Sequence, residues 1–259
     1  MQQWFHTWLA LPVVMLFVTL FAFYVGMASL LVWLSFRSKL STRIQSFKGL
    51  VAPFFVSTAT IFGLLVGFLS SDIWERNKQA SRVVLEETEE LLGLYSVSTA
   101  TGSDNARVRA AIRNYVNAVV EDEWPKLAVQ QRSARADAAL DALLREVTLP
   151  GVVKDPIVER TMVELVLKIR AAHEDRIALS NDRTMGTKWA AVLLLALITQ
   201  ISIAAVHLEN PRPQLAALII FTVAAVSILG LLAVHEAPFE PPVFVPPGPI
   251  ADVLKQVPM

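Results

Sequence analysis

The sequence predicts an all-α membrane protein with four transmembrane helices and a helical extramembrane domain between the second and third spans. Hydrophobic residues make up 54% of the 259 residues, and the mean hydropathy of +0.50 is too high for an ordinary soluble domain. Four apolar segments without charged residues, grouped in two pairs, are long enough to cross the roughly 30 Å of bilayer hydrocarbon as helices. The charged residues concentrate between the two pairs.

The first pair lies in residues 1–70, which we assign to a transmembrane hairpin with spans at about 9–36 and 50–69. The short linker between these spans carries four positive and no negative side chains: Arg37, Lys39, Arg43 and Lys48. By the positive-inside rule this linker is cytoplasmic. We therefore expect the domain at residues 72–188 on the extracytoplasmic side.

The second span is predicted to continue into water as one helix, because no proline or glycine interrupts Phe68–Leu92. Beyond the membrane, one apolar stripe recurs at helical spacing: Ile73, Ala80, Val84, Leu91 and Tyr95. Another part of the chain must cover this stripe. The acidic residues around it are interpreted as a solvated face: Glu86, Glu87, Glu89 and Glu90.

The extramembrane domain, assigned to residues 71–187, is predicted to be helical throughout. After the first helix, a second one with Ser103 or Asp104 as its N-cap carries four apolar residues on one face: Val108, Ile112, Tyr115 and Val119. Pro125 is expected to kink or restart the helix before a further helical stretch over Leu127–Val147.

The last helix of this domain has a clear start signal, because an acidic N-cap, Asp155, precedes Pro156 at the first helical position. It is expected to run through the charged stretch to Arg183. Gly186 is expected to mark a break, and Lys188 and Trp189 are interpreted as interfacial anchors.

The second transmembrane hairpin is assigned to residues 188–234, with spans at Trp189–Val206 and Pro213–Val234. The link between these spans is short, so they are expected to lie antiparallel and side by side. The proline-rich tail, residues 235–259, should be extended, with a short helix over Ile250–Gln256.

Composition and motifs exclude several classes of protein. The net charge is zero, so a nucleic-acid partner is not expected, whereas the lipid bilayer is. No nucleotide-binding loop and no catalytic motif occurs, which predicts neither an enzyme nor a cofactor. His173, Glu174 and Asp175 face different ways on a helix and are interpreted as solvated surface, so no metal site is predicted.

The stretch around Pro125 is the hardest to dismiss as surface. Glu121 and Glu123 lie just before Trp124 in the sequence. The side chains of these two acids are expected to dock on arginines of another helix of the domain. A ligand-binding or gating role for this stretch stays open.

Three stretches resemble the bestrophin-like family of bacterial membrane proteins of uncharacterised function. The residues that carry the resemblance are Trp74, Glu75 and Arg76, then Tyr115, Glu121, Glu123, Trp124 and Pro125, and finally Pro238 and Phe239. That family is more distantly similar to bestrophins, which are anion channels of several subunits. The resemblance implies a homo-oligomer in a bacterial inner membrane, with anions as partners. No acidic run follows Phe239, so the calcium-binding stretch of bestrophins is not expected here. Bestrophins keep their large domain in the cytosol, so the resemblance implies the opposite orientation to the one that the basic linker predicts.

In bestrophins the second span lines the pore, and the resemblance places the corresponding constriction here. Counting back from Trp74 brings Val56, Thr60 and Leu64 to it, stacked on one helix face. Gly63 and Gly67 lie beside this face and form a small-xxx-small pair for close helix packing.

Two classes of function stay open from the sequence. One is an oligomeric pore built on the second span, for which the resemblance implies anions as the conducted ions. The other is a membrane-anchored sensor or interaction scaffold whose helical domain binds a partner or ligand. The oligomeric state distinguishes them, because a pore lined by one helix per subunit requires a ring.

Overall fold

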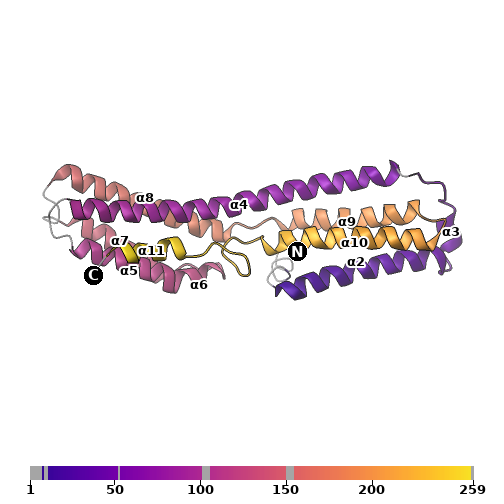
Figure 1. Cartoon of the computed structure of the whole chain (residues 1–259), viewed down its shortest axis with the longest axis horizontal. Coiled ribbons are helices and arrows are strands. Elements are labelled where there is room, and N and C mark those ends of the chain that lie inside the picture. Colours follow the sequence, from indigo (N-terminus) through magenta and orange to yellow (C-terminus); the bar gives the residue numbers. More distant parts are fainter. Residues whose placement is uncertain (1–7, 9–10, 52, 101–105, 150–154, 258–259) are drawn as a thin grey trace. The chain divides into compact units, whose positions relative to one another are not determined.

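The computed structural model describes the chain except residues 1–7, 9–10, 52, 101–105, 150–154 and 258–259. Within the described residues all regular secondary structure is helical, and four helices are long and apolar enough to cross a membrane (Figure 1). This confirms the predicted fold class. The chain divides into two compact units: the first comprises Met1–Trp74 and Thr184–Glu236, and the second comprises Glu75–Arg183 and Ala237–Met259.

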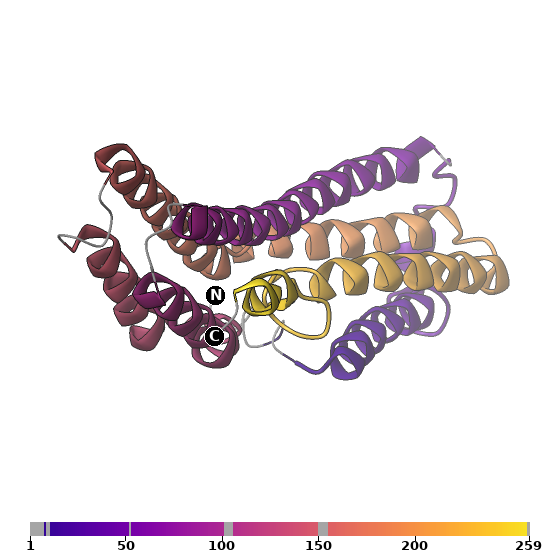
Figure 2. The same ribbon diagram turned by 60° about the vertical axis from the view of Figure 1, so that its left-hand side comes forward.

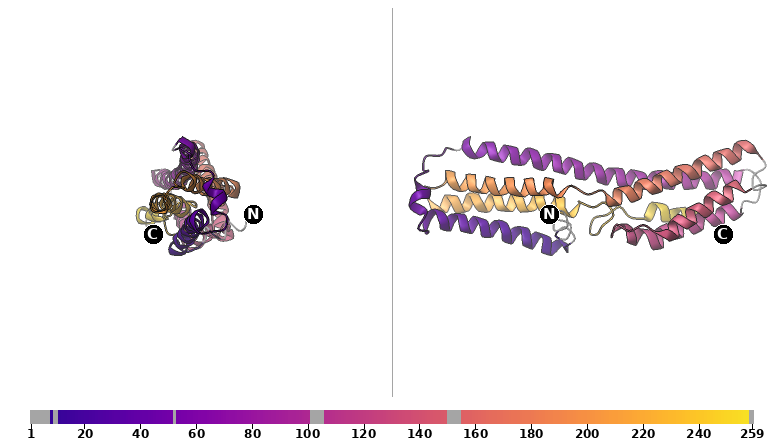
Figure 3. Two further views of the ribbon diagram at one scale, coloured as in Figure 1. Left: turned by 90° about the vertical axis from the view of Figure 1, so that its right-hand side faces the viewer. Right: turned by 180° about the vertical axis from the view of Figure 1, so that it is seen from behind.

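The first unit holds the four candidate spans: α2 (Val13–Phe36), the first part of α4 (Pro53–Ala100), α9 (Gly186–Val206) and α10 (Pro211–Val234). A short helix, α3 (Ser41–Gln45), lies in the basic linker. Helices α2, α9 and α10 lie side by side, as Figure 3 shows. Their buried apolar side chains form the core of this unit together with one stripe of α4, for example Leu16, Leu20, Val66, Val192 and Leu229.

Polar side chains join the spans within this core. The amide of Gln200 in α9 donates to the backbone oxygen of Tyr24 at 3.1 Å and to Oγ1 of Thr222 at 2.9 Å. Gln214 of α10 donates to the Ala204 carbonyl at 2.7 Å. Hydrogen bonds between spans hold membrane helices together where the hydrophobic effect supplies no attraction between them.

Trp189 was interpreted as an interfacial anchor, and the structure shows that this is wrong. Its side chain is fully buried among the helices of the first unit, and its indole Nε1–H donates to Glu236 at 3.2 Å. A large ring that fills space between helices is held by packing rather than by the headgroup region.

Helix α4 is continuous over Pro53–Ala100, which confirms the prediction that the second span extends into the next domain as one helix. The predicted stripe is buried at Ile73, Ala80, Val84 and Leu91. Glu87 is fully buried as well, so its assignment to a solvated face is wrong. The reason is its register, because Glu87 lies three residues after Val84 and four before Leu91, on the apolar stripe itself.

The second unit is built from the remainder of α4, the helices between α4 and α9, and the last helix of the chain (Figure 2). These are α5 (Ala106–Ala118), the π-helix η1 (Val119–Glu123), α6 (Trp124–Leu127), α7 (Ala134–Thr148), α8 (Pro156–Asn181) and α11 (Gly248–Gln256). One hydrophobic core contains side chains from all of these elements and from the tail, for example Leu91, Ile112, Leu143, Ile169 and Val253.

The helix predicted over Leu127–Val147 is interrupted, because α6 ends at Leu127 and α7 begins at Ala134. Gln130 has a φ of 58°, a left-handed conformation that no helix interior contains, and Ser133 caps α7 by accepting the Ala136 N–H at 3.0 Å. The start signal at Asp155 is confirmed, since its carboxylate accepts the Ile157 N–H at 2.9 Å.

Further along, α8 ends at Asn181, and Gly186 begins α9 after a short non-helical link. The predicted short tail helix is confirmed as α11. The predicted N-caps Ser103 and Asp104 lie outside the described residues.

A close approach between Gly230 of α10 and Phe17 of α2 gives a first prediction. A Cβ added at Gly230 would lie 2.3 Å from Cε1 of Phe17, so Gly230→Ala should cost about 1–3 kcal/mol through overpacking. Gly26→Ala, where nothing lies within 4 Å of the added Cβ, is the control and should not destabilise. Thermal unfolding in detergent measures both. In a protein that already carries Phe17→Ala, the further substitution Gly230→Ala should cause no additional loss of stability. Equal effects of the two single substitutions would contradict the close approach.

Candidate functional site

The second unit is organised around one fully buried arginine, Arg176 of α8. Its guanidinium forms ion pairs with Glu87 of α4 and Glu123 of η1, and both carboxylates are fully buried. A buried charge without partners is strongly unfavourable, so these pairs fix three elements of the chain against one another. The expectation that Glu123 docks on an arginine of another helix is thereby confirmed.

Aromatic side chains enclose the guanidinium and connect it to the tail. The guanidinium carbon of Arg176 lies 5.3 Å from the centroid of the Trp124 ring, a cation–π arrangement. The Phe239 ring meets Trp124 edge-to-face at 5.8 Å, and the indole Nε1–H of Trp124 donates to the Val245 carbonyl at 3.2 Å. The tail after the fourth span is therefore attached to the same cluster.

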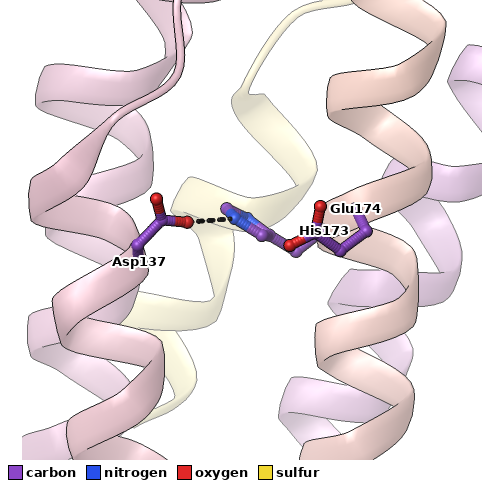
Figure 4. A group of neighbouring side chains, drawn as sticks. All are labelled: Asp137, His173 and Glu174. Carbon is purple, nitrogen blue, oxygen red and sulfur yellow. Dashed lines mark hydrogen bonds and ion pairs between the residues drawn. The ribbon is translucent and has the colours of Figure 1, made fainter.

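Tyr115 and His173 complete the buried cluster. The Tyr115 hydroxyl donates to Glu87 at 2.6 Å and lies 3.2 Å from Nδ1 of His173. Nε2 of His173 lies 3.2 Å from the Asp137 carboxylate, the contact drawn in Figure 4. An Nε2–H donated to Asp137 leaves Nδ1 as an acceptor for the Arg176 guanidinium, also at 3.2 Å. His173 is fully buried, so its assignment to solvated surface is wrong.

Burial shifts the ionisation of this cluster. It raises the pKa of Glu123 to about 8, with Asp137 as the next contributor. It lowers the pKa of Arg176 to about 9 and lowers the pKa of His173 below its ordinary value. Burial also raises the pKa of the Tyr115 hydroxyl, so Tyr115 stays a neutral donor.

Ligand atoms of Asp137, His173 and Glu174 lie within 4.8 Å of one another, close enough in principle for a metal ion. Arg132 supplies the positive charge there instead. Its guanidinium donates to both Asp137 oxygens at 2.8 and 2.9 Å and to both Glu174 oxygens at 2.8 and 2.5 Å. Hydrogen bonds from Arg132 lower the pKa of Glu174. The arrangement is an arginine–carboxylate cluster, and we assign no metal to it.

The other residues of the resemblance have different surroundings. In the first unit the Trp74 ring lies 4.8 Å from the ring of His235. In the second unit Arg76 is buried and its Nε lies 3.3 Å from Asp182, while Glu75 is exposed. Glu121 is exposed and pairs with Arg135 at 3.0 Å. Pro125 is at the N-terminus of α6, and the Pro238 carbonyl accepts the Val245 N–H at 2.8 Å.

The proposed pore residues lie together on an open face of α4. Val56 and Leu64 are 50% and 59% exposed, and Thr60 between them is exposed as well. The opposite face of the same span is buried in the first unit, at Phe62, Val66 and Leu69. Gly63 and Gly67 have open space within 4 Å of an added Cβ, so no described helix of this chain packs on them.

Sequence reasoning missed Arg176 and Glu87 as site residues, and it did not single out Glu236 as a buried residue of the first unit. Glu236 is buried in the first unit, where its carboxylate accepts the Thr184 N–H at 2.7 Å. A signal for Arg176 was present, because residues buried in α8 recur at spacings of four and three: Met162, Val166, Ile169, His173 and Arg176. Charged residues that continue an apolar stripe indicate a buried polar cluster.

The four helices that are long and apolar enough to cross a membrane indicate a multi-pass membrane protein in contact with lipid. The model of the bestrophin-like domain matches residues 22–250, and the chain therefore belongs to the bestrophin-like family. This confirms the resemblance inferred from the sequence.

Two solved structures share the fold. One, a membrane protein with a proline-to-alanine substitution, has a TM-score of 0.67 and 12% identity, with 93% of this chain and 96% of that chain covered. The other, a bacterial bestrophin homologue from Klebsiella pneumoniae with an aspartate-to-alanine substitution, has a TM-score of 0.65, 13% identity and the same coverage. No curated protein matches the chain.

The central role of Arg176 gives a second prediction. Arg176→Met leaves two acidic side chains, Glu87 and Glu123, buried without the guanidinium that binds them, and should lower the free energy of unfolding by about 3–5 kcal/mol. The control Arg135→Met removes an exposed ion pair with Glu121 and should cost less than about 1 kcal/mol. Combining Arg176→Met with Glu87→Gln and Glu123→Gln should restore much of the loss. Similar thermal unfolding of the two single variants would contradict this account.

Proposed function

We propose that the protein is an oligomeric anion channel in which the membrane-spanning part of α4 lines the pore. The observation that carries the proposal is the open face of this helix. Three of the four spans pack on one another, whereas α4 leaves a broad face with Val56, Thr60 and Leu64 uncovered by the described chain. In a ring of identical subunits, one such face per subunit would surround a central axis.

The composition of this face suits a helix-lined pore. Gly63 and Gly67 permit close approach by α4 of a neighbouring copy. The hydroxyl of Thr60 donates to the Val56 carbonyl at 2.8 Å, so it is satisfied within its own helix. The Val56, Thr60 and Leu64 side chains would form successive narrow rings that gate by dewetting. The preference for anions rests on membership of the bestrophin-like family.

The proposed orientation follows from the basic linker. Four positive side chains between α2 and α4 favour a cytoplasmic position, which would place residues 72–188 on the other side of a bacterial inner membrane. The domain would then lie outside the cytoplasm, with both ends of the described chain on that side.

The pore proposal predicts the effect of shortening a side chain that narrows the pore. Leu64→Ala should widen the constriction and raise the unitary anion conductance in planar bilayers, because a ring of large side chains is shortened. Leu215→Ala is the matched control, since it makes the same change at an exposed position of α10, 44% accessible. Equal conductance of Leu64→Ala and the unmodified protein, or an equal rise in the control, would contradict a pore lined by α4.

The orientation predicts the labelling of a cysteine introduced on the domain. The chain has no cysteine, and Ile157, which is 76% exposed at the start of α8, is a suitable position. Ile157→Cys should react with a membrane-impermeant maleimide in spheroplasts with intact inner membranes. Reaction only after lysis would overturn the orientation and leave the pore proposal untouched.

A further inference from the structure

We propose that the buried cluster around Arg176 is a proton-binding site, which holds one exchangeable proton on the carboxyl group of Glu123. The ligand is a single proton, and the site lies wholly within the second unit. Neither the fold nor membership of the family assigns this property.

The net charge of the buried side chains is the first argument for a bound proton. Four ionisable groups of the cluster are fully buried: Arg176, Glu87, Glu123 and His173. With both carboxylates ionised and the imidazole neutral, these groups hold one uncompensated negative charge. One added proton makes the buried set neutral, which avoids the cost of a net charge in a low dielectric.

Geometry indicates where the proton is held. The Glu123 oxygen Oε1 is bound by Arg176 and lies 3.5 Å from Nδ1 of His173. The other oxygen, Oε2, is buried without a hydrogen-bond partner among the described residues. A carboxylate with one unsolvated oxygen is disfavoured as an anion, whereas both Glu87 oxygens are bound, by Tyr115 and Arg176. The proton is therefore assigned to Glu123, at the oxygen Oε2 that has no other partner among the described residues.

The groups that face Glu123 from other elements support this assignment. The negative charges of Asp137 on α7, Glu174 on α8 and Asp122 on η1 disfavour the ionised form of Glu123. The positive charge of Arg132 favours that form. From α5 and α4 the facing groups are the neutral Tyr115 hydroxyl and the paired Glu87. The tail contributes the Phe239 ring and the Val245 carbonyl around Trp124. Burial raises the pKa of Glu123 to about 8.

The pH dependence of stability follows from this assignment. In the unfolded chain Glu123 loses its proton near the ordinary value of about 4.3, whereas the folded protein keeps it to about pH 8. Between these values the folded state binds more protons than the unfolded state, so stability falls as the pH rises. His173, which is held neutral, acts in the acid range, where its protonation in the unfolded state disfavours folding.

Loss of the proton would leave Glu123 and Glu87 both charged against one guanidinium. Arg176, which binds both side chains in the structure, would then balance only one of two negative charges, and one of these charges lies on α4. Because α4 is a single helix that begins in the second span, the proposal extends to an effect of this added charge on channel gating. This last step rests on the proposed channel function, whereas the proton site itself does not.

Infrared difference spectroscopy of the purified protein across about pH 6 to 9 tests the site directly. We expect a carboxylic-acid C=O band that disappears with a midpoint near pH 8, is absent in Glu123→Gln, and persists in the matched control Glu121→Gln, an exposed acid two residues away. A spectrum of the unmodified protein without such a band, or a band that survives in Glu123→Gln, would overturn the proposal.

Thermal unfolding provides a second test, and its decisive measurement uses only the unmodified protein. The midpoint for the unmodified protein should fall as the pH rises from about 6 to 9, and this slope should be lost in Glu123→Gln and kept in Glu121→Gln. A midpoint that does not fall over this range in the unmodified protein would refute the proton site. If the infrared band is present but anion flux does not depend on pH, the proton site stands and its effect on channel gating is refuted.

Discussion

The structure of the second unit depends on the ion pairs of one buried guanidinium. Arg176 binds a carboxylate from α4 and one from η1, and the Trp124 ring that covers it is contacted in turn by the tail. Removing the guanidinium leaves both acidic side chains buried without their cation, so the elements that carry them are held in one arrangement. Much of what the family resemblance identified in this unit, Tyr115, Glu123, Trp124 and Phe239, has its physical reason in this requirement.

Helix α4 has two different environments along its length. In the second unit its apolar stripe is covered by the same chain, at Ala80, Val84 and Leu91. In the membrane only the stripe of Phe62, Val66 and Leu69 is covered, and the face with the two glycines is open. A helix that is satisfied at one end and uncovered at the other is what a pore-lining element of a ring would require, since its remaining contacts would come from neighbouring copies.

The sequence predicted the fold well because its strongest signals are local. The length of apolar segments, the uninterrupted stretch to Leu92 and the cap at Asp155 each act within a few residues. The errors concern residues whose environment is set by distant partners. Glu87, His173 and Trp189 were assigned to surfaces because their buried contacts come from other helices. Ser133 is the N-cap of α7, but the residues on both sides of it follow a helical pattern. The break before Ala134 was therefore missed.

The most direct test of the account is chemical modification of the open face of α4. In this cysteine-free chain, Thr60→Cys should react with a bulky thiol reagent, and the reaction should block anion flux through the reconstituted protein. Ile219→Cys on α10, 52% exposed, should leave flux unchanged after the same treatment. Flux that persists after complete modification of Thr60→Cys, with Leu64→Cys behaving alike, would contradict a pore lined by α4.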